Sequence, residues 1–214
     1  MNTKNTNAPE GVHEEDALCE NCCDTFDMVE IGHKVPDIAF KVFHKNEIKD
    51  VKLSDYRGKW LILFFYPADF TFVCPTELEE MADNYKAFQD LGAEVVSVSC
   101  DTVYVHKAWQ DASETIKKIT FPMAADPTGE LSKAFDTYIY EAGESLRGTF
   151  IIDPEGVLKT IEVNHNDIGR SAAETLRKLQ AAKFVSEHGG NVCPASWKPG
   201  DDTLKPGLDL VGKI

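Results

Sequence analysis

The chain has 214 residues, of which 43% are hydrophobic, and a formal net charge of −14. This length and composition fit one sizeable globular domain with extensions. The acidic balance argues against nucleic acid and anionic membrane surfaces as partners, because both favour a basic protein face.

The sequence contains no candidate membrane span. Its longest apolar run, Trp60 to Tyr66, is far shorter than a bilayer requires, and the polar N-terminus lacks the apolar centre of a signal peptide. We therefore expect a cytoplasmic protein. In that reducing compartment, the six cysteines are expected to be catalytic, metal-binding or buried rather than a static disulfide scaffold.

Residues 1–28 form a polar, acidic N-terminal extension, which we predict to be a mobile arm. It carries Cys19, Cys22 and Cys23, whose C-x-x-C spacing suits a dithiol/disulfide pair or half of a zinc site. His13 could add a ligand, but no other histidine lies nearby in the sequence. Three hypotheses stay open: an inert cluster, an auxiliary redox pair and a metal site.

Residues 29–188 alternate between strand and helix patterns. We predict strands at 38–43, 59–66 and 94–99, and helices at 75–90 and 103–117. Loops and turns at 121–123 and 126–129 precede a short helix that ends near Phe135. A hairpin over 149–152 and 157–163 and a helix from Ser171 to about His188 complete the domain. This order predicts an α/β fold with a central mixed sheet flanked by helices. Residues 189–214, which are rich in glycine and proline, are predicted to form an extended C-terminal arm.

The segment from Phe64 to Glu77 is the most informative part of the chain. A buried strand leads into a loop that ends at Cys74, and Pro75 is expected to begin a helix. The free N–H groups and the positive dipole end of a helix favour a thiolate, which is the nucleophilic form of cysteine. Cys100, in contrast, follows a buried strand and is expected to be a small core residue.

Pro67, Thr71 and Cys74 match the active-site motif Pro-x-x-x-Thr-x-x-Cys, and the segment resembles that of the peroxiredoxins. The resemblance covers roughly residue 29 to the C-terminus, and its last seven residues resemble those of the bacterial alkyl hydroperoxide reductase C type. Further matching segments are Ser99-Cys100-Asp101-Thr102, His106-Lys107-Ala108-Trp109, Asp126-Pro127-Thr128-Gly129, Arg147-Gly148-Thr149-Phe150, Gly169-Arg170 and Val192-Cys193-Pro194-Ala195.

The resemblance implies a thioredoxin-like fold and reduction of hydrogen peroxide and organic hydroperoxides. Cys74 would be the peroxidatic cysteine that becomes a sulfenic acid. Pro67, Thr71 and Arg147 would hold the peroxide oxygens, and Glu77 would bridge Arg147 and Arg170 to fix their direction. No cofactor is implied.

Cys193 matches the resolving cysteine of the typical two-cysteine class. It would attack the sulfenic acid of a partner subunit, which implies an intersubunit disulfide, a homodimer and commonly a decamer of five dimers. Trp197 is expected to anchor the arm in the reduced state. A flavoprotein disulfide reductase or thioredoxin would then recycle the disulfide.

Two differences from the family members that are sensitive to over-oxidation predict an enzyme whose Cys74 resists over-oxidation by peroxide. Residues 141–145 read Glu-Ala-Gly-Glu-Ser instead of a Gly-Gly-Leu-Gly insertion, and the chain ends at Ile214 without a Tyr-Phe extension.

Two other function classes fit the sequence less well. A thioredoxin-type disulfide oxidoreductase would need a C-x-x-C where the sequence has Cys74-Pro75-Thr76-Glu77, and nothing in the sequence demands a holdase chaperone.

Overall fold

The structure, a computed structural model, describes residues 28–214. Its centre is a seven-stranded sheet with the strand order β2-β1-β5-β4-β3-β8-β9. The β3–β4 and β4–β5 pairs are parallel, whereas the other neighbouring pairs are antiparallel. The predicted mixed sheet is therefore confirmed. Within the described range, no helix has the length and apolar character needed to cross a membrane.

The sheet strands are β1 (Ala39–His44), β2 (Glu47–Lys52), β3 (Trp60–Phe65), β4 (Ala93–Ser99), β5 (Met123–Ala125), β8 (Arg147–Ile152) and β9 (Leu158–Asn164). A separate two-stranded ribbon joins β6 (Tyr138–Ile139) and β7 (Glu144–Ser145). The α-helices are α1 (Cys74–Asp90), α2 (Val103–Ala112), α3 (Glu130–Ala134) and α4 (Ala172–Glu187). Three short 3₁₀ helices are η1 (Leu53–Tyr56), η2 (Ile116–Lys118) and η3 (Leu208–Leu210).

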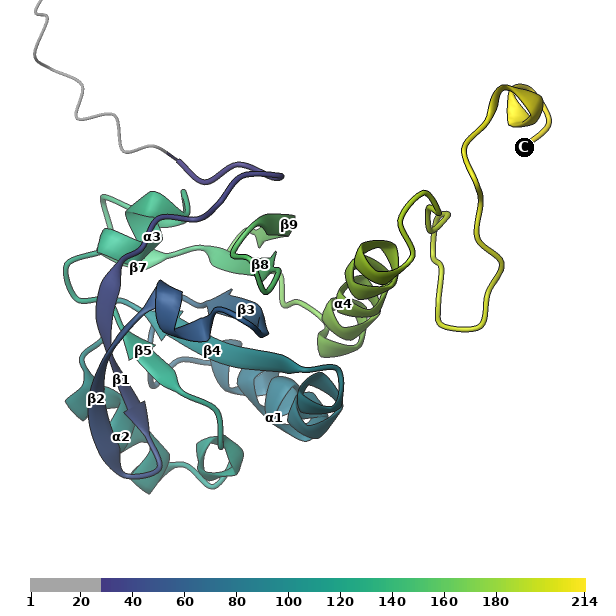
Figure 1. Cartoon of the computed structure of the whole chain (residues 1–214). Coiled ribbons are helices and arrows are strands. Elements are labelled where there is room, and N and C mark those ends of the chain that lie inside the picture. Colours follow the sequence, from purple (N-terminus) through teal and green to yellow (C-terminus); the bar gives the residue numbers. More distant parts are fainter. Residues whose placement is uncertain (1–27) are drawn as a thin grey trace, which may run out of the picture.

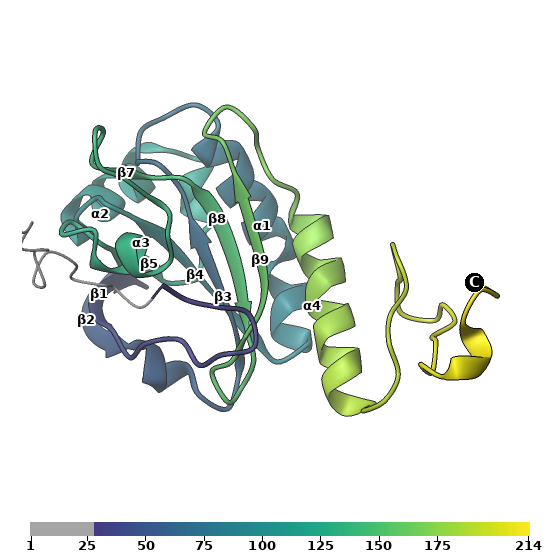
Figure 2. The ribbon, with the colours of Figure 1, turned by 90° about the horizontal axis from the view of Figure 1, so that it is seen from above.

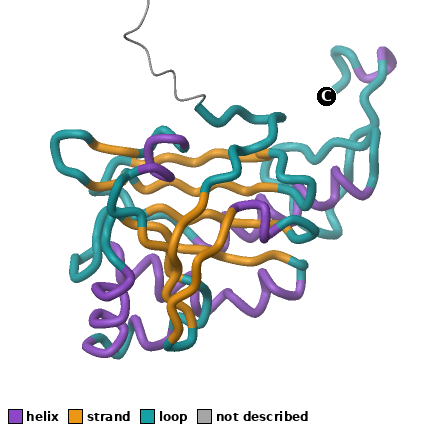
Figure 3. Tube along the Cα trace, turned by 60° about the vertical axis from the view of Figure 1, so that its left-hand side comes forward, coloured by secondary structure: helices purple, strands orange, loops and turns teal. Residues whose placement is uncertain are grey.

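Helices cover both faces of the sheet (Figures 1 and 3). One apolar cluster joins β3 to side chains of α1, α2 and α4, and a second cluster joins it to α3 and η1. Alternate residues of β3 serve the two clusters, so that Ile62 and Phe64 face one side while Leu63 and Phe65 face the other. Burial on both faces explains why this strand is a continuous apolar run.

Several element predictions were wrong in detail. The helix predicted over 103–117 ends at Ala112, because the backbone becomes extended at Ser113 and resumes only as the 3₁₀ turn η2. The strand β5 was not predicted: it begins at Met123, which was assigned to a loop, and lies buried between β1 and β4. The strand β2 was not predicted either, because its side chains are mostly exposed and lack an alternating apolar pattern.

The C-terminal arm, residues 189–214, follows α4 and extends away from the sheet, and its last residues stand apart from α4 (Figures 1 and 2). Val192 and Leu204 form an isolated antiparallel bridge that closes a loop within the arm. The Trp197 ring is 3% exposed and packs on Phe184 of α4, with 4.9 Å between ring centroids. The packing expected of Trp197 is therefore present, and its role as an anchor of the arm in the reduced state stays a prediction.

Candidate active site

Cys74 is the first residue of α1 and is fully buried. The chain reaches it from β3 through the loop 66–73, and Val73 is the N-cap residue of the helix. The helix thus begins one residue before the predicted Pro75. Cys74 therefore lies in the first turn of α1, at the positive end of the helix dipole, as the sequence predicted.

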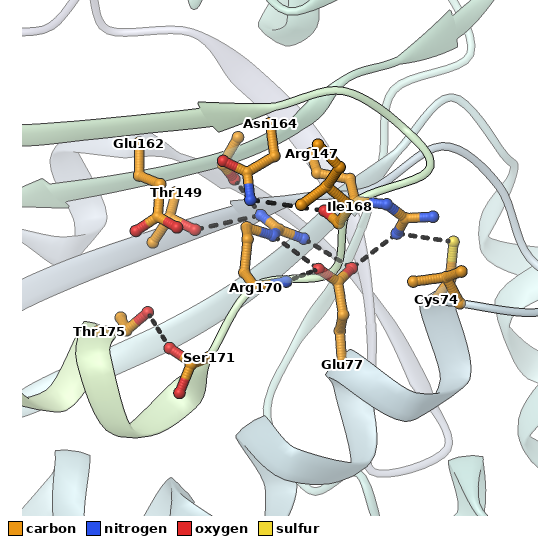
Figure 4. Close-up of polar contacts among 12 residues, drawn as sticks. Cys74, Glu77, Arg147, Thr149, Glu162, Asn164, Ile168, Arg170, Ser171 and Thr175 are labelled. Carbon is orange, nitrogen blue, oxygen red and sulfur yellow. Dashed lines mark hydrogen bonds and ion pairs between the residues drawn. The ribbon is translucent and has the colours of Figure 1, made fainter.

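Arg147 places a cation beside this sulfur (Figure 4). Its Nη1 donates to Cys74 Sγ at 3.4 Å and to Glu77 Oε2 at 2.6 Å, while its Nε donates to the Asn166 carbonyl at 2.8 Å. Arg147 begins β8, which pairs antiparallel with β3. The start of β8 therefore lies beside the end of β3, where the loop to Cys74 begins.

Glu77 connects the two arginines (Figure 4). It lies three residues after Cys74, on the same face of α1. Its Oε1 accepts bonds from the Arg170 backbone N–H at 2.7 Å and from Arg170 Nε at 2.9 Å, and its Oε2 accepts from Arg170 Nη2 at 3.0 Å. With the bond from Arg147, this carboxylate accepts four N–H groups, so its position and direction are tightly fixed.

Arg170 is itself held by groups that sequence reasoning did not single out. Its Nη1 donates to the Gly148 carbonyl at 2.7 Å and to Thr149 Oγ1 at 3.1 Å, and its guanidinium lies 3.5 Å from the centre of the Phe64 ring. Thr149 belongs to a matched motif and could have been recognised as a polar residue directly before the apolar end of its strand. The Asn166 carbonyl carried no sequence signal, because a backbone acceptor is the same at every residue.

Attraction between opposite charges favours the ionised forms of Glu77 and Arg147. Burial disfavours the carboxylate of Glu77, but bonds from Arg170 and the charges of both arginines outweigh it and hold its pKa below the ordinary value. Burial likewise opposes the charge of Arg147, yet its bond to Cys74 and the attraction of Glu77 raise its pKa above the ordinary value. Burial lowers the pKa of Arg170. Arg147 therefore remains a cation in contact with the sulfur.

The loop before Cys74 is fixed by a buried polar network. The Tyr66 hydroxyl donates to Asp69 Oδ1 at 2.7 Å, and His106 Nδ1 of α2 lies 2.8 Å from Asp69 Oδ2. Asp69 N–H also donates to Asp101 Oδ2 at 2.8 Å. Asp101 and His106 belong to matched motifs, but no role was predicted for them. This network positions the loop relative to both β4 and α2.

Pro67 and Thr71 occupy the same loop. Pro67 is buried, and Thr71 is partly buried with its hydroxyl donating to the Ala68 carbonyl at 2.9 Å. The Thr71 hydrogen is therefore directed to the loop backbone in this structure, while the hydroxyl oxygen keeps its capacity to accept.

The remaining cysteines lie elsewhere. Cys193 packs beside the second half of α4, where its Sγ lies 3.9 Å from the Ala181 carbonyl. Cys100 is partly buried, and its Sγ lies 3.8 Å from Ser132 Oγ. Burial raises the pKa of Cys100 to about 11, which disfavours a catalytic role and fits the predicted core residue. The predicted cluster Cys19, Cys22 and Cys23 lies outside the described residues.

Comparisons with known proteins agree with this arrangement. Residues 31–161 match the model of the AhpC/TSA family, and residues 181–211 match that of the C-terminal domain of 1-Cys peroxiredoxin. Alkyl hydroperoxide reductase C of Bacillus subtilis is 50% identical over 184 residues, which cover 86% of this chain and 98% of the relative. The Escherichia coli protein of the same name is 49% identical over the same coverage.

Solved structures give the same result. The crystal structure of Enterococcus faecalis AhpC has a TM-score of 0.76 at 50% identity and covers 78% of this chain and 100% of its own. Reduced Plasmodium vivax 2-Cys peroxiredoxin has a TM-score of 0.80 at 32% identity, covering 84% and 94%. The fold is therefore the thioredoxin-like fold of the peroxiredoxins. The buried cysteine at a helix N-terminus and the arginine that donates to its sulfur agree with these matches. The chain belongs to the AhpC/TSA family of peroxidases.

Proposed function

We propose that Cys74 reduces hydrogen peroxide and organic hydroperoxides as the peroxidatic cysteine. Its thiolate attacks the terminal peroxide oxygen, so that an S–O bond forms as the O–O bond breaks. Cys74 becomes a sulfenic acid, and the leaving alkoxide or hydroxide takes a proton to become alcohol or water. The observation that supports this proposal is the hydrogen bond of 3.4 Å from the Arg147 guanidinium to Cys74 Sγ. The Arg147 side chain is almost fully buried.

The neighbouring residues would act on the charge that moves from sulfur to the leaving oxygen. Arg147 is a prepositioned cation, and such donors act most strongly where water is excluded. Glu77 and Arg170 keep its guanidinium in one direction through the bonds described above. Pro67 and Thr71 would shape the oxygen-binding side of the pocket, with Thr71 able to accept from the peroxide hydrogen.

Cys193 would resolve the sulfenic acid from a partner subunit. Its thiol attacks Cys74 sulfur, so that an S–S bond forms, the S–O bond breaks and water leaves. Within one chain, Cys193 lies near Ala181. That position is about 15 Å along α4 from Ser171, which caps the helix end next to the site. A disulfide needs Cα atoms within about 7 Å. Figure 2 also shows α4 between the arm and α1, so a partner's arm is the better source of Cys193.

The free edge of β9 supports a homodimer. This strand ends the sheet. Leu158, its first residue, exchanges backbone bonds with Gly32 and His33, whereas the outer edge beyond Leu158 pairs with no other strand among the described residues. Its exposed face carries Ile161 and Val163, which are 38% and 40% exposed. An open edge is a template for pairing with a second chain. Five such dimers could then assemble into the decamer that the family resemblance implies.

The electron donor would be a flavoprotein disulfide reductase or thioredoxin, which returns the Cys74–Cys193 disulfide to two thiols. A cytoplasmic location would suit a cycle that begins from free thiols. A coupled assay that compares the purified reductant systems would distinguish the two donors.

Substitution of the cysteines tests the proposal. Cys74→Ser should abolish peroxide reduction. Cys193→Ser should allow one sulfenic turnover, detected with a dimedone probe, and then stop. Cys100→Ser is the matched control and should turn over like the wild type, because its thiol lies outside the site. Activity of Cys74→Ser near the wild-type level would refute the assignment, and sustained recycling by Cys193→Ser would refute the resolving role.

A further inference from the structure

The Val192–Leu204 loop of the C-terminal arm is seated on α4 by few contacts. In the described part of the chain, two hydrogen bonds join α4 to residues beyond Asn191. One is the weak contact of Cys193 Sγ with the Ala181 carbonyl at 3.9 Å. The other runs from Arg177 Nη1 to the Trp197 carbonyl at 3.1 Å. In addition to these bonds, the Trp197 ring packs on Phe184.

Arg177 is the charged group among these contacts, and its direction is fixed. Its Nε and Nη2 donate to the two carboxylate oxygens of Glu174, both at 2.8 Å, one turn earlier on α4. This paired geometry leaves Nη1 to reach the arm. Bidentate pairs of this kind restrict the guanidinium plane, so less freedom is lost when the third group binds.

The loop held in this way contains Cys193. Val192 and Leu204 exchange backbone bonds of 2.8 and 3.0 Å, so that Cys193 lies directly beside the closing bridge. Cys193 also lines a groove with Arg177, Ala181 and Val185. In this seated position its sulfur faces α4. It must leave that position before it can form a disulfide with Cys74 of another subunit.

Seating and disulfide formation are therefore competing states of the arm. The rate of resolution depends on the fraction of arms that are released, and any contact made only in the seated state lowers that fraction. We propose that Arg177 is a positioning residue that latches the arm onto α4 and thereby limits the release of Cys193. This inference rests on the proposed resolving role of Cys193.

The latch affects the fate of the Cys74 sulfenic acid. That group has two competing reactions: attack by a Cys193 thiol, which gives a disulfide and water, and reaction with a second hydroperoxide, which gives sulfinic acid and an alcohol or water. A latch that delays Cys193 favours the second reaction. Removing it should shift the products toward the disulfide.

The test compares Arg177→Gln, Glu174→Gln and the control Lys178→Gln in the reduced full-length protein. Lys178 lines the same groove but bonds to Glu162 of β9, at 2.6 Å, instead of the arm. Two quantities are measured: hydrogen exchange of the peptide spanning Val192–Leu204, and the single-turnover rates of Cys74 oxidation and of disulfide formation.

Arg177→Gln should speed exchange of this peptide and accelerate disulfide formation about three- to tenfold, the effect expected from one partly exposed, charge-assisted hydrogen bond. The rate of Cys74 oxidation should stay at the wild-type value. Glu174→Gln should act in the same direction but less strongly, and Lys178→Gln should match the wild type.

Two results would overturn the latch. One is an Arg177→Gln protein that behaves as the Lys178→Gln control in both measurements. The other is slower disulfide formation with a pH profile moved upward, which would mean that Arg177 activates the Cys193 thiol. Failure of the wild type to form the Cys74–Cys193 disulfide would instead refute the proposed function, and hydrogen exchange would still decide whether Arg177 holds the arm.

Discussion

Replacing Glu77 by glutamine tests whether the arginine pair depends on this carboxylate. The substitution Glu77→Gln keeps the size of the side chain but removes its charge and replaces one acceptor oxygen by an N–H₂ donor. Glu77 accepts four bonds, one from Arg147 and three from Arg170. The two arginine side chains are 4% and 0% exposed, so water cannot replace the lost acceptor.

The structure sets the size of both expected effects. Breaking a buried ion pair by removing one partner costs about 3–5 kcal/mol of unfolding free energy, because the remaining charge stays buried. For catalysis, complete loss of a charge-stabilising donor typically costs about 10²- to 10³-fold. Arg147 would keep its bond to the Asn166 carbonyl, so we expect a smaller loss, roughly 10- to 100-fold, in the rate of Cys74 oxidation.

The assay combines denaturant unfolding with stopped-flow measurement of Cys74 oxidation. Glu79→Gln is the control, since Glu79 lies two residues along the same helix and pairs with Lys118 at the surface. It should change stability by less than about 1 kcal/mol and leave the oxidation rate unaltered. A folded Glu77→Gln protein that reacts with peroxide at the wild-type rate would refute the reasoning.

Stability and cysteine reactivity should also respond to pH and to peroxide. The lowered pKa of Glu77 means that its contribution to stability is present above its unfolded pKa, about 4.3, and is lost as the pH falls through its folded pKa. The unfolding free energy of the wild type should therefore fall more steeply below about pH 4 than that of Glu77→Gln, and parallel curves would contradict this. Because burial raises the pKa of Cys100 to about 11, iodoacetamide at pH 8 should label it at least about tenfold more slowly than a free thiol, as followed by mass spectrometry. After treatment with millimolar peroxide, Cys74 should be recovered mainly as disulfide. Abundant sulfinic Cys74 after few turnovers would contradict the predicted resistance to over-oxidation.

The N-terminal cysteines need a separate experiment, because all three hypotheses for them remain open. Deletion of residues 1–24 removes Cys19, Cys22 and Cys23 together. A redox relay predicts slower turnover with at least one electron donor, and a metal site predicts a lower bound-metal content. Unchanged values of both would leave the inert cluster.

The chemistry of the site and most of the elements could be predicted from the amino-acid sequence. The apolar run of β3, the cysteine before Pro75 and the spacing of Pro67, Thr71 and Cys74 are local signals, and the structure confirms the strand and helix that they predicted. Such signals depend on side-chain type and period, which one sequence displays directly. The motif resemblance then indicated Arg147, Arg170 and Glu77 as partners, but without their geometry.

How these residues meet depends on the tertiary structure. Arg147 reaches Cys74 across 73 positions of sequence, and Arg170 reaches Glu77 across 93. The first contact exists because β8 pairs with β3 in one register, and the second because the chain after β9 crosses to α1 before α4 begins. Long-range pairing depends on the packing of the whole sheet. Backbone acceptors such as the carbonyls of Asn166 and Trp197 also carry no sequence signal. The orientation of Arg147 and the hydrogen bond from Arg177 to the arm therefore could not be predicted from the sequence alone.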